Sequence, residues 1–360
     1  MKHWLETKSV FDRLASLRAE GTRTVLATVV RVIGSAYRHE GAKLLVAEDG
    51  TTTGNVSGGC LEQDVREVAL QVIQSGAPQL RTYCSGTDEI EAWNLGLGCE
   101  GRVDVWIEPA RDPRPRERAL LDGREPFVVG TEIGGRGTRD EGRVIVTRAG
   151  IEGQLGSAPL ASAVAERARE LLGTERSQLQ DIAGHSVFLD AFLPPPQLVI
   201  FGAGDDAQPL ARFAAQVGFR VAIVDRRPGN LTASRFPEAT QLLNDAAGLG
   251  SLTLDGSSYA VVMTHNYADD GAYLRALVPT PVAYIGMLGP RQRTERILQD
   301  VSGGKPIDDS RIFGPVGLDI GTDGAEQVAL SVIAEILAVR ANRRLRSLRE
   351  RRVAIHAPAD

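Results

Sequence analysis

Cysteine is scarce in this sequence. The 360 residues contain three cysteines, Cys60, Cys84 and Cys99. An odd number without the spacing of a disulfide framework is not typical of small secreted domains, which are dense in cysteine. We therefore expect free thiols in a reducing cytoplasm.

Long apolar runs and a strong excess of one charge are also missing. No apolar run approaches the roughly 20 residues that span a membrane, and Glu6 and Asp12 interrupt the segment where a signal peptide would carry its apolar core. Phe11, Leu14 and Leu17 instead predict one face of an opening helix. The formal net charge of −5 argues against a general nucleic-acid-binding protein. We expect neither a membrane span nor a nucleic-acid partner.

Three consecutive prolines at positions 194–196 divide the sequence. Because such a run joins neither a helix nor a central strand, it predicts a boundary between two domains, 1–193 and 194–360. The first domain mixes strand and helix patterns, among them a hairpin around Asp49 and Gly50, and is expected to be an α+β domain. Within it, residues 151–185 have a polar, helical pattern.

The second domain alternates short apolar strands with helices. The strand-like runs are QLVIFGAG, RVAIVD, YAVVMT and VAYIG. This alternation is typical of a parallel sheet with crossover helices, so we predict a Rossmann-like, doubly wound domain. Residues 323–352 predict one long C-terminal helix, whose arginine-rich end is either a solvated helix terminus or a docking surface for an acidic partner.

A glycine-rich turn follows the first strand of this domain. Gly202, Gly204 and Ala207 have the spacing G-x-G-x-x-A between a strand and a helix, and Asp225 ends the next strand. Gly204 lets a diphosphate approach the backbone, and Asp225 can accept a hydrogen bond from a ribose hydroxyl. The context predicts an adenine dinucleotide such as NAD. The alternative is a Rossmann-like domain whose site is empty or repurposed.

The residues around Asp225 also bear on the kind of nucleotide. An aspartate at this position disfavours a ribose 2′-phosphate, whereas Arg226 and Arg227 directly behind it would attract one. We expect NADH to bind more tightly than NADPH.

Two further loops are expected at the same edge of the sheet, because ligands of such folds lie beyond the carboxyl ends of the strands. His265 follows the third strand, and Gly286, Gly289 and Arg291 follow the fourth. Glycines, a helix N-terminus and an arginine suit a phosphate group. His265 either belongs to this site or is a loop histidine with a structural partner, and no second histidine or cysteine stands at metal-ligand spacing from it.

The stretch GNVSGGCLE places Gly58 and Gly59 directly before Cys60, and an amphipathic helical pattern starts at Leu61. A helix N-terminus favours a thiolate or a bound anion through its free N–H groups. Three interpretations of Cys60 remain open. It is a packing thiol, a nucleophile with His39 as its base, or an anchor for a ligand that carries sulfur and phosphate.

Six stretches of the chain form a recognisable set. They are GSAYRHEGAKLLVAEDGTTTGNVSGGCLE, GLGCEGRVDVWIEP, FGAGDDAQPLARFAAQVGFRVAIVDRRP, MTHNYADD, YIGMLGPRQR and GPVGLDIGTDGAEQVALSVIAEILA. Together they resemble the XdhC/CoxI family of accessory proteins, which mature molybdenum hydroxylases such as xanthine dehydrogenase. The resemblance implies a protein that binds the molybdenum cofactor, protects it while a cysteine desulfurase adds the sulfido ligand, and inserts it into the apo-enzyme. Such a protein is a cofactor chaperone rather than a turnover enzyme.

Carried over to this chain, the resemblance points to Cys60 and Cys99 as cofactor-proximal thiols, with Cys60 near the molybdenum. The same motif contributes Gly58, Gly59 and Glu62 to the cofactor site. The expected partners are a xanthine dehydrogenase-type apo-enzyme, a cysteine desulfurase and a second copy of the chain in a homodimer.

Three positions depart from the family pattern, and one cysteine lies outside it. The family usually has aspartate where this chain has Asn266, serine at Pro290 and proline at Gly324. The first two departures touch the expected ligand pocket, whereas the third concerns a helix start. Cys84 lacks the glycine-rich surroundings of the other two cysteines and is expected to pack.

Two functions from other classes compete with the chaperone. One is an NAD-dependent oxidoreductase that uses Gly202, Gly204 and Asp225, with Cys60 or His265 in acid–base work. The other is a nucleotide-sensing regulatory protein that uses the same turn. A dehydrogenase has no need of the SGGCLE motif, and a chaperone has no obvious need of the dinucleotide turn.

Overall fold

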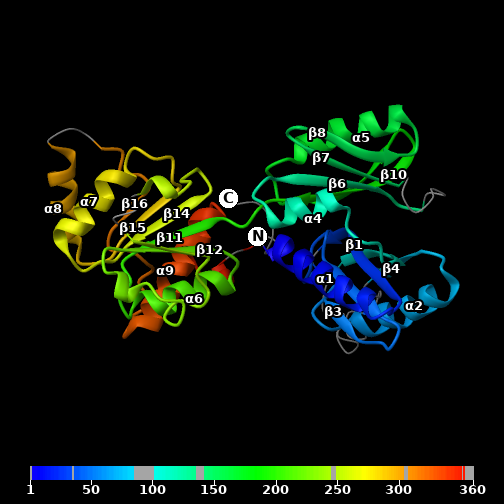
Figure 1. Cartoon of the computed structure of the whole chain (residues 1–360), viewed down its shortest axis with the longest axis horizontal. Coiled ribbons are helices and arrows are strands. Elements are labelled where there is room, and N and C mark those ends of the chain that lie inside the picture. Colours follow the sequence, from blue (N-terminus) through cyan, green and yellow to red (C-terminus); the bar gives the residue numbers. More distant parts are fainter. Residues whose placement is uncertain are drawn as a thin grey trace. The chain divides into compact units, whose positions relative to one another are not determined.

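The computed structural model describes residues 2–34, 36–84, 101–134, 142–244, 249–303, 307–350 and 352. Cys99 therefore lies outside the described residues. The chain divides into two compact units, Met1–Pro194 and Pro195–Asp360, and the division falls within the run of three prolines. Figure 1 shows the elements of both units.

The first unit opens with a helix and an antiparallel sheet of order β3-β2-β1-β5-β4. The elements are α1 (Lys2–Ala19), β1 (Thr24–Gly34), β2 (Lys43–Ala47), β3 (Thr52–Gly54), α2 (Glu62–Ser75), β4 (Gln79–Cys84) and β5 (Gly101–Pro109). Helix α2 buries Val65, Val68 and Val72 against the apolar side chains of β1 and β5. The predicted hairpin is the β2–β3 pair, which turns at Asp49 and Gly50.

A second antiparallel sheet, of order β8-β7-β6-β10-β9, completes the first unit. Its elements are α4 (Pro115–Asp122), β6 (Phe127–Glu132), β7 (Gly142–Thr147), β8 (Gly150–Leu155), α5 (Ala158–Leu171), β9 (Gln178–Ile182) and β10 (His185–Phe192). The prediction of a helix throughout residues 151–185 was wrong, because β8 and β9 flank α5. Strand β8 is exposed along most of its length, so it lacks the alternation of apolar residues that marks a half-buried strand.

One apolar core joins α1 to both sheets. Phe11 and Leu14 of α1 pack in the same cluster as Leu45 of β2, Phe127 of β6 and Phe192 of β10. The predicted apolar face of the opening helix is therefore buried. The fold class of the first unit, an α+β domain, is confirmed.

The second unit is a parallel sheet of order β13-β12-β11-β14-β15-β16. Its elements are β11 (Gln197–Phe201), α6 (Ala207–Gln216), β12 (Arg220–Asp225), β13 (Gln241–Asn244), β14 (Ser258–Val262), α7 (Tyr267–Leu277), β15 (Tyr284–Met287), α8 (Arg291–Ser302), β16 (Ile312–Phe313) and α9 (Ala325–Arg340). Numbered along the unit, this is the 3-2-1-4-5-6 order of the Rossmann fold. Helix α6 contacts α9, and α7 contacts α8. The prediction of a doubly wound domain is confirmed.

Helix α9 is shorter than predicted. It ends at Arg340 rather than near residue 352. Asn342 adopts a left-handed conformation with a φ of 49°, and the N–H of Arg343 donates to the carbonyl of Ala338 at 2.9 Å. Left-handed asparagine with this backbone bond is a common helix stop. The described arginines after Arg340 consequently lie beyond the helix, not in its last turn.

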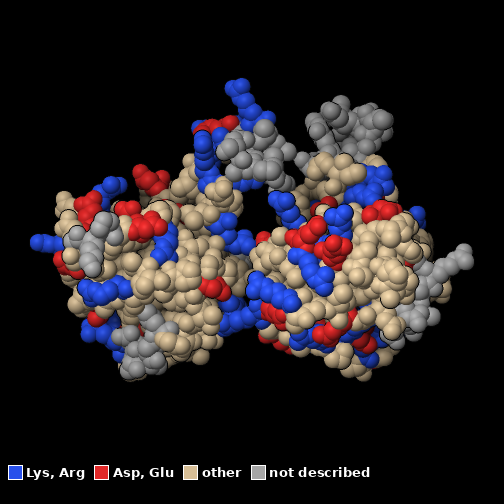
Figure 2. All heavy atoms as spheres, turned by 90° about the horizontal axis from the view of Figure 1, so that it is seen from above, with Lys and Arg blue, Asp and Glu red and all other residues tan. Residues whose placement is uncertain are grey.

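The surface carries charges of both signs. Figure 2 shows Lys and Arg interspersed with Asp and Glu on the face seen, as expected for a net charge of −5. Among the described residues, none of the helices combines the length and the apolar character needed to cross a bilayer.

Candidate functional site

Cys60 lies in the loop between β3 and α2. The helix begins two residues later, at Glu62. Cys60 is a free, half-buried thiol that packs against the core beneath α2. Gly59 has a φ of +114°, which side chains other than glycine rarely adopt, and the space where its Cβ would lie is open. The loop therefore leaves room at the residue directly before Cys60.

An internal network holds this loop in shape. The Glu62 carboxylate accepts hydrogen bonds from the N–H groups of Val56 at 3.2 Å and Ser57 at 2.8 Å, and from the Ser57 hydroxyl. The Ser57 oxygen accepts in turn from the N–H groups of Gly59 and Leu61, both at 3.1 Å. Four backbone donors of the loop before α2 are thus used inside the protein.

Burial alone would raise the pKa of the Glu62 carboxyl, but the hydrogen bonds from Ser57 outweigh it and hold the pKa below its ordinary value. Stability gained from a depressed carboxyl pKa is present above the unfolded pKa, about 4.3, and is lost as the pH falls below it. The hydrogen bonds that hold the loop around Cys60 therefore depend on the ionised form of Glu62.

We expect Glu62→Gln to lower the free energy of unfolding by about 1 kcal/mol at neutral pH, since the amide is a weaker acceptor than the carboxylate. The difference from the parent should shrink as the pH falls below about 4, because protonation of Glu62 then progressively removes the stability that its depressed pKa provides. Urea unfolding at both pH values measures it, with the exposed Glu166→Gln as control. A difference that stays constant with pH would contradict this role of Glu62.

An exposed aromatic ring lies against the same loop. A Cβ on Gly58 would come 3.3 Å from Cγ of Tyr37, whose side chain is 69% exposed. Gly58, two residues before Cys60, thus allows this ring to lie close to the backbone. Cys84, which was expected to pack, is exposed instead, because it ends the edge strand β4.

The glycine turn of the second unit has the geometry that its sequence predicts. Gly202 has a φ of +121°, and its Cβ would lie 2.5 Å from the carbonyl oxygen of Met263. Its N–H donates to Val224 at 2.8 Å. The position therefore requires glycine, where the loop passes close to the backbone after β14. Gly204 follows two residues later, before α6.

Asp225 ends β12 at the same edge of the sheet but is already paired. Its buried carboxylate accepts hydrogen bonds from the N–H of Ala203 at 2.7 Å and from Nε and Nη2 of Arg227 at 2.9 and 2.8 Å. Burial would raise the pKa of Asp225, but the bonds from Arg227 lower it overall. A ribose hydroxyl would have to compete with Arg227 for this carboxylate.

His265 adopts a left-handed conformation with a φ of 60°, and its Nε2 lies 2.7 Å from Asp206 Oδ2 near the start of α6. The structure thus brings the loop after β14 to the glycine turn. Asn266 caps α7 by accepting from the N–H groups of Ala268 and Asp269, both at 3.0 Å. Aspartate caps equally well, so this departure from the family pattern preserves the helix start.

The three remaining residues of the expected phosphate site, Gly286, Gly289 and Arg291, lie in different local environments. Gly286 lies inside β15 rather than after it, and its Cβ would meet Val316 at 2.5 Å, so it serves packing. Gly289 follows the strand with a φ of +131°, and Arg291 opens α8 with an exposed side chain. At this edge a small cavity of about 40 Å³ has a lining that includes Asp225, Arg226, Arg227, Thr264, Asn266 and Asp269.

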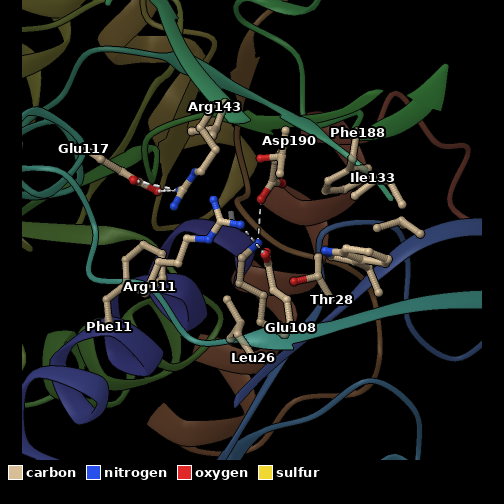
Figure 3. A pocket seen from close by; sticks show the side chains of 15 residues that line it. Phe11, Leu26, Thr28, Glu108, Arg111, Glu117, Ile133, Arg143, Phe188 and Asp190 are labelled. Carbon is tan, nitrogen blue, oxygen red and sulfur yellow. Dashed lines mark hydrogen bonds and ion pairs between the residues drawn. The ribbon is translucent and has the colours of Figure 1, made fainter. Parts of the chain in front are cut away.

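A second cavity, of about 50 Å³, lies between the two sheets of the first unit (Figure 3). Lys43 of β2 and Asp190 of β10 line it, and Lys43 Nζ donates to Asp190 Oδ2 at 2.5 Å. The sequence interpretation missed both residues. Their only signal was a single charge within an apolar run, in AKLLVA and VFLDAF. No cluster of three or more His, Cys, Asp or Glu side chains suited to a metal ion occurs in the described part of the chain.

The chain matches known proteins along most of its length. The model of the XdhC and CoxI family matches residues 17–84, and that of the XdhC Rossmann domain matches residues 198–336. The chain is 33% identical to a probable xanthine dehydrogenase subunit of Bacillus subtilis, over 91% of this chain and 96% of the relative. It is 25% identical to the molybdenum cofactor insertion chaperone PaoD of Escherichia coli, over 94% and 93%.

A solved structure is similar to this chain over most of its length. It is a crystal structure described as a xanthine dehydrogenase from Bacillus halodurans, with 29% identity and a TM-score of 0.76. The match covers 93% of this chain and 97% of the other. The fold described above is therefore shared beyond this chain.

Proposed function

The chain belongs to the XdhC and CoxI family, and from this premise we propose that it binds the molybdenum cofactor and inserts it into a xanthine dehydrogenase-type hydroxylase. The similarity to an insertion chaperone over nearly the whole chain carries the proposal. A cysteine desulfurase and a second copy of the chain belong to it as partners, and the cytoplasm as its location.

Within this proposal Cys60 contacts the cargo. The cofactor presents molybdenum, sulfur and a phosphate, and a thiolate is a soft ligand that suits the first of these. The half-buried thiol and the open space at Gly59, with the exposed ring of Tyr37 next to the loop, support this role. Cys99, outside the described residues, is proposed as the second thiol of the same site.

Co-purified cofactor tests the proposal. The protein is purified from cells that make the molybdenum cofactor, and released pterin is measured by the fluorescence of its oxidised form beside a visible spectrum. We expect pterin in near-equimolar amount. Protein that carries none, and takes up none when free cofactor is supplied, would contradict the proposal.

A permanent subunit is the second candidate, because one relative and one solved structure are named as xanthine dehydrogenase. A subunit stays with its enzyme in fixed stoichiometry, whereas a chaperone leaves after delivery. Co-expression with the hydroxylase and size-exclusion chromatography separate the two. An equimolar complex that retains the chain at full activity would favour the subunit.

The Rossmann-like unit is proposed to bind an adenine dinucleotide such as NAD. We predict that NADH binds about tenfold more tightly than NADPH, as measured by calorimetry. The two arginines that could attract a 2′-phosphate are paired with carboxylates, Arg227 with Asp225 at 2.8 Å and Arg226 with Asp269 at 2.9 Å. Asp225→Asn should weaken this preference, and tighter binding of NADPH to the parent would count against the role of Asp225.

A further inference from the structure

Three ion pairs surround the cavity between the two sheets of the first unit (Figure 3). Each joins a cationic side chain to a carboxylate, and all six side chains line the cavity. The pairs are Lys43–Asp190, Arg143–Glu117 and Arg111–Glu108, at 2.5, 2.8 and 3.2 Å. Buried charges are costly unless they are paired, so the pairs account for the charges themselves.

The hydrogen-bonding capacity of two of these carboxylates is largely taken. Oδ2 of Asp190 accepts a hydrogen bond from Lys43. Oδ1 accepts from the Ser177 hydroxyl at 2.9 Å and also lies 2.7 Å from His3 Nε2. Both oxygens of Glu117 face Nη2 of Arg143 at 2.8 Å. These acceptors therefore offer little to a ligand.

Donors, by contrast, remain. Trp106 is 8% exposed and lines the cavity, and its buried Nε1–H has no partner among the described residues. Arg143 contacts Glu117 through Nη2 only. Because its guanidinium has five N–H groups, further donors remain for a ligand. The hydroxyl-bearing side chains of Thr28 and Thr131 line the same space.

The unpartnered Trp106 N–H and the remaining N–H groups of Arg143 suit a ligand that is rich in acceptor oxygens. We propose that this cavity binds a small oxyanion, either a carboxylate or a tetrahedral anion such as phosphate or molybdate. A cavity of about 50 Å³ matches a small anion and is too small for a pterin cofactor. The site is distinct from the Cys60 loop and stands without the proposed cofactor function.

A purely structural role leaves the indole unexplained. The Lys43–Asp190 pair, together with the apolar core, accounts for the joining of the two sheets, since Lys43 and Asp190 come from different sheets. Joining the sheets does not require an unpartnered Trp106 N–H beside the cavity, and buried donors are rarely left unpaired. An anion that accepts from this group explains it.

The indole itself reports on binding. The full chain, labelled with ¹⁵N-tryptophan in a Trp93→Phe background, keeps two indole signals, from Trp4 and Trp106. It is titrated with acetate, phosphate and molybdate in a buffer free of other oxyanions. We expect at least one anion to shift the Trp106 signal with saturation at millimolar concentration or below. The Trp4 signal should stay fixed, because its Nε1 already donates to the carbonyl of Leu121 at 3.1 Å.

Variants test whether the cavity hydroxyls and the indole act together. Thr28→Val is nearly isosteric and Trp106→Phe retains an aromatic ring, and each removes one polar group. Each should weaken binding of the anion at least about fivefold in calorimetry. Thr52→Val, an exposed threonine of β3, is the matched control and should change nothing. The anion that binds identifies the ligand class. If none shifts the Trp106 signal at tens of millimolar, or if every anion shifts Trp4 equally, the proposal is wrong.

Discussion

Replacing Cys60 by serine is expected to leave the fold intact and to reduce co-purified molybdenum cofactor by at least about tenfold, which corresponds to about 1.4 kcal/mol of binding free energy. Serine is nearly isosteric with cysteine, so the half-buried loop and the Ser57–Glu62 network should persist. What is lost is a soft, readily ionised donor. Activation of an apo-hydroxylase by the variant should fall in parallel.

Variants of the other two cysteines serve as controls for Cys60→Ser. Cys84→Ser should bind and deliver as the parent does, because Cys84 is exposed at the end of an edge strand. Cys99→Ser should show a weaker loss than Cys60→Ser. If Cys60→Ser retains and delivers cofactor as well as the parent, Cys60 is a packing residue.

Removing the buried carboxylate of Asp190 is expected to cost about 3–5 kcal/mol of the free energy of unfolding, because it leaves Lys43 buried without a counter-charge. Asp190→Leu is the variant, and denaturant unfolding at neutral pH is the measurement. The double variant Lys43→Met/Asp190→Leu replaces the pair by apolar groups and should be more stable than Asp190→Leu alone. A double variant less stable than the single one would contradict this view of the pair.

The loss of stability in Asp190→Leu should also depend on pH. Burial would raise the pKa of Asp190, but the charges of Lys43 and His3 and their hydrogen bonds hold it well below its ordinary value. A depressed carboxyl pKa contributes stability above the unfolded pKa, about 3.9, which is lost as the pH falls toward the folded value. The difference between parent and Asp190→Leu should therefore shrink below about pH 4.

The parallel sheet was predictable because its strands are continuous apolar runs. Strands β11, β12 and β14 are buried on both faces, so hydrophobicity alone marks them. Gly202 and Asp225 were predictable from their spacing around these strands. Strand β8 was not, because it lies exposed at a sheet edge, and the end of α9 depended on the left-handed conformation of Asn342.

The partners of the site residues could not be predicted from the sequence. Asp225 was expected to accept a hydrogen bond from a ribose. Its carboxylate already accepts one from Arg227, two residues away. Glu62 closes its own loop through Ser57, a contact that the motif does not indicate, and its place near the cofactor stays a prediction. The cavity between the sheets joins residues as distant in sequence as Lys43 and Asp190, and no local pattern relates them.

Transfer of the cofactor tests the central claim most directly. The purified, cofactor-loaded chain is mixed with a cofactor-free hydroxylase, while a second molybdoenzyme apoprotein competes for any cofactor released into solution. The account predicts that hydroxylase activity rises in proportion to the pterin lost from the chain, and that the chain is afterwards recovered free of the enzyme. Equal activation by free cofactor at the same concentration, or activity only while the chain stays bound, would contradict it.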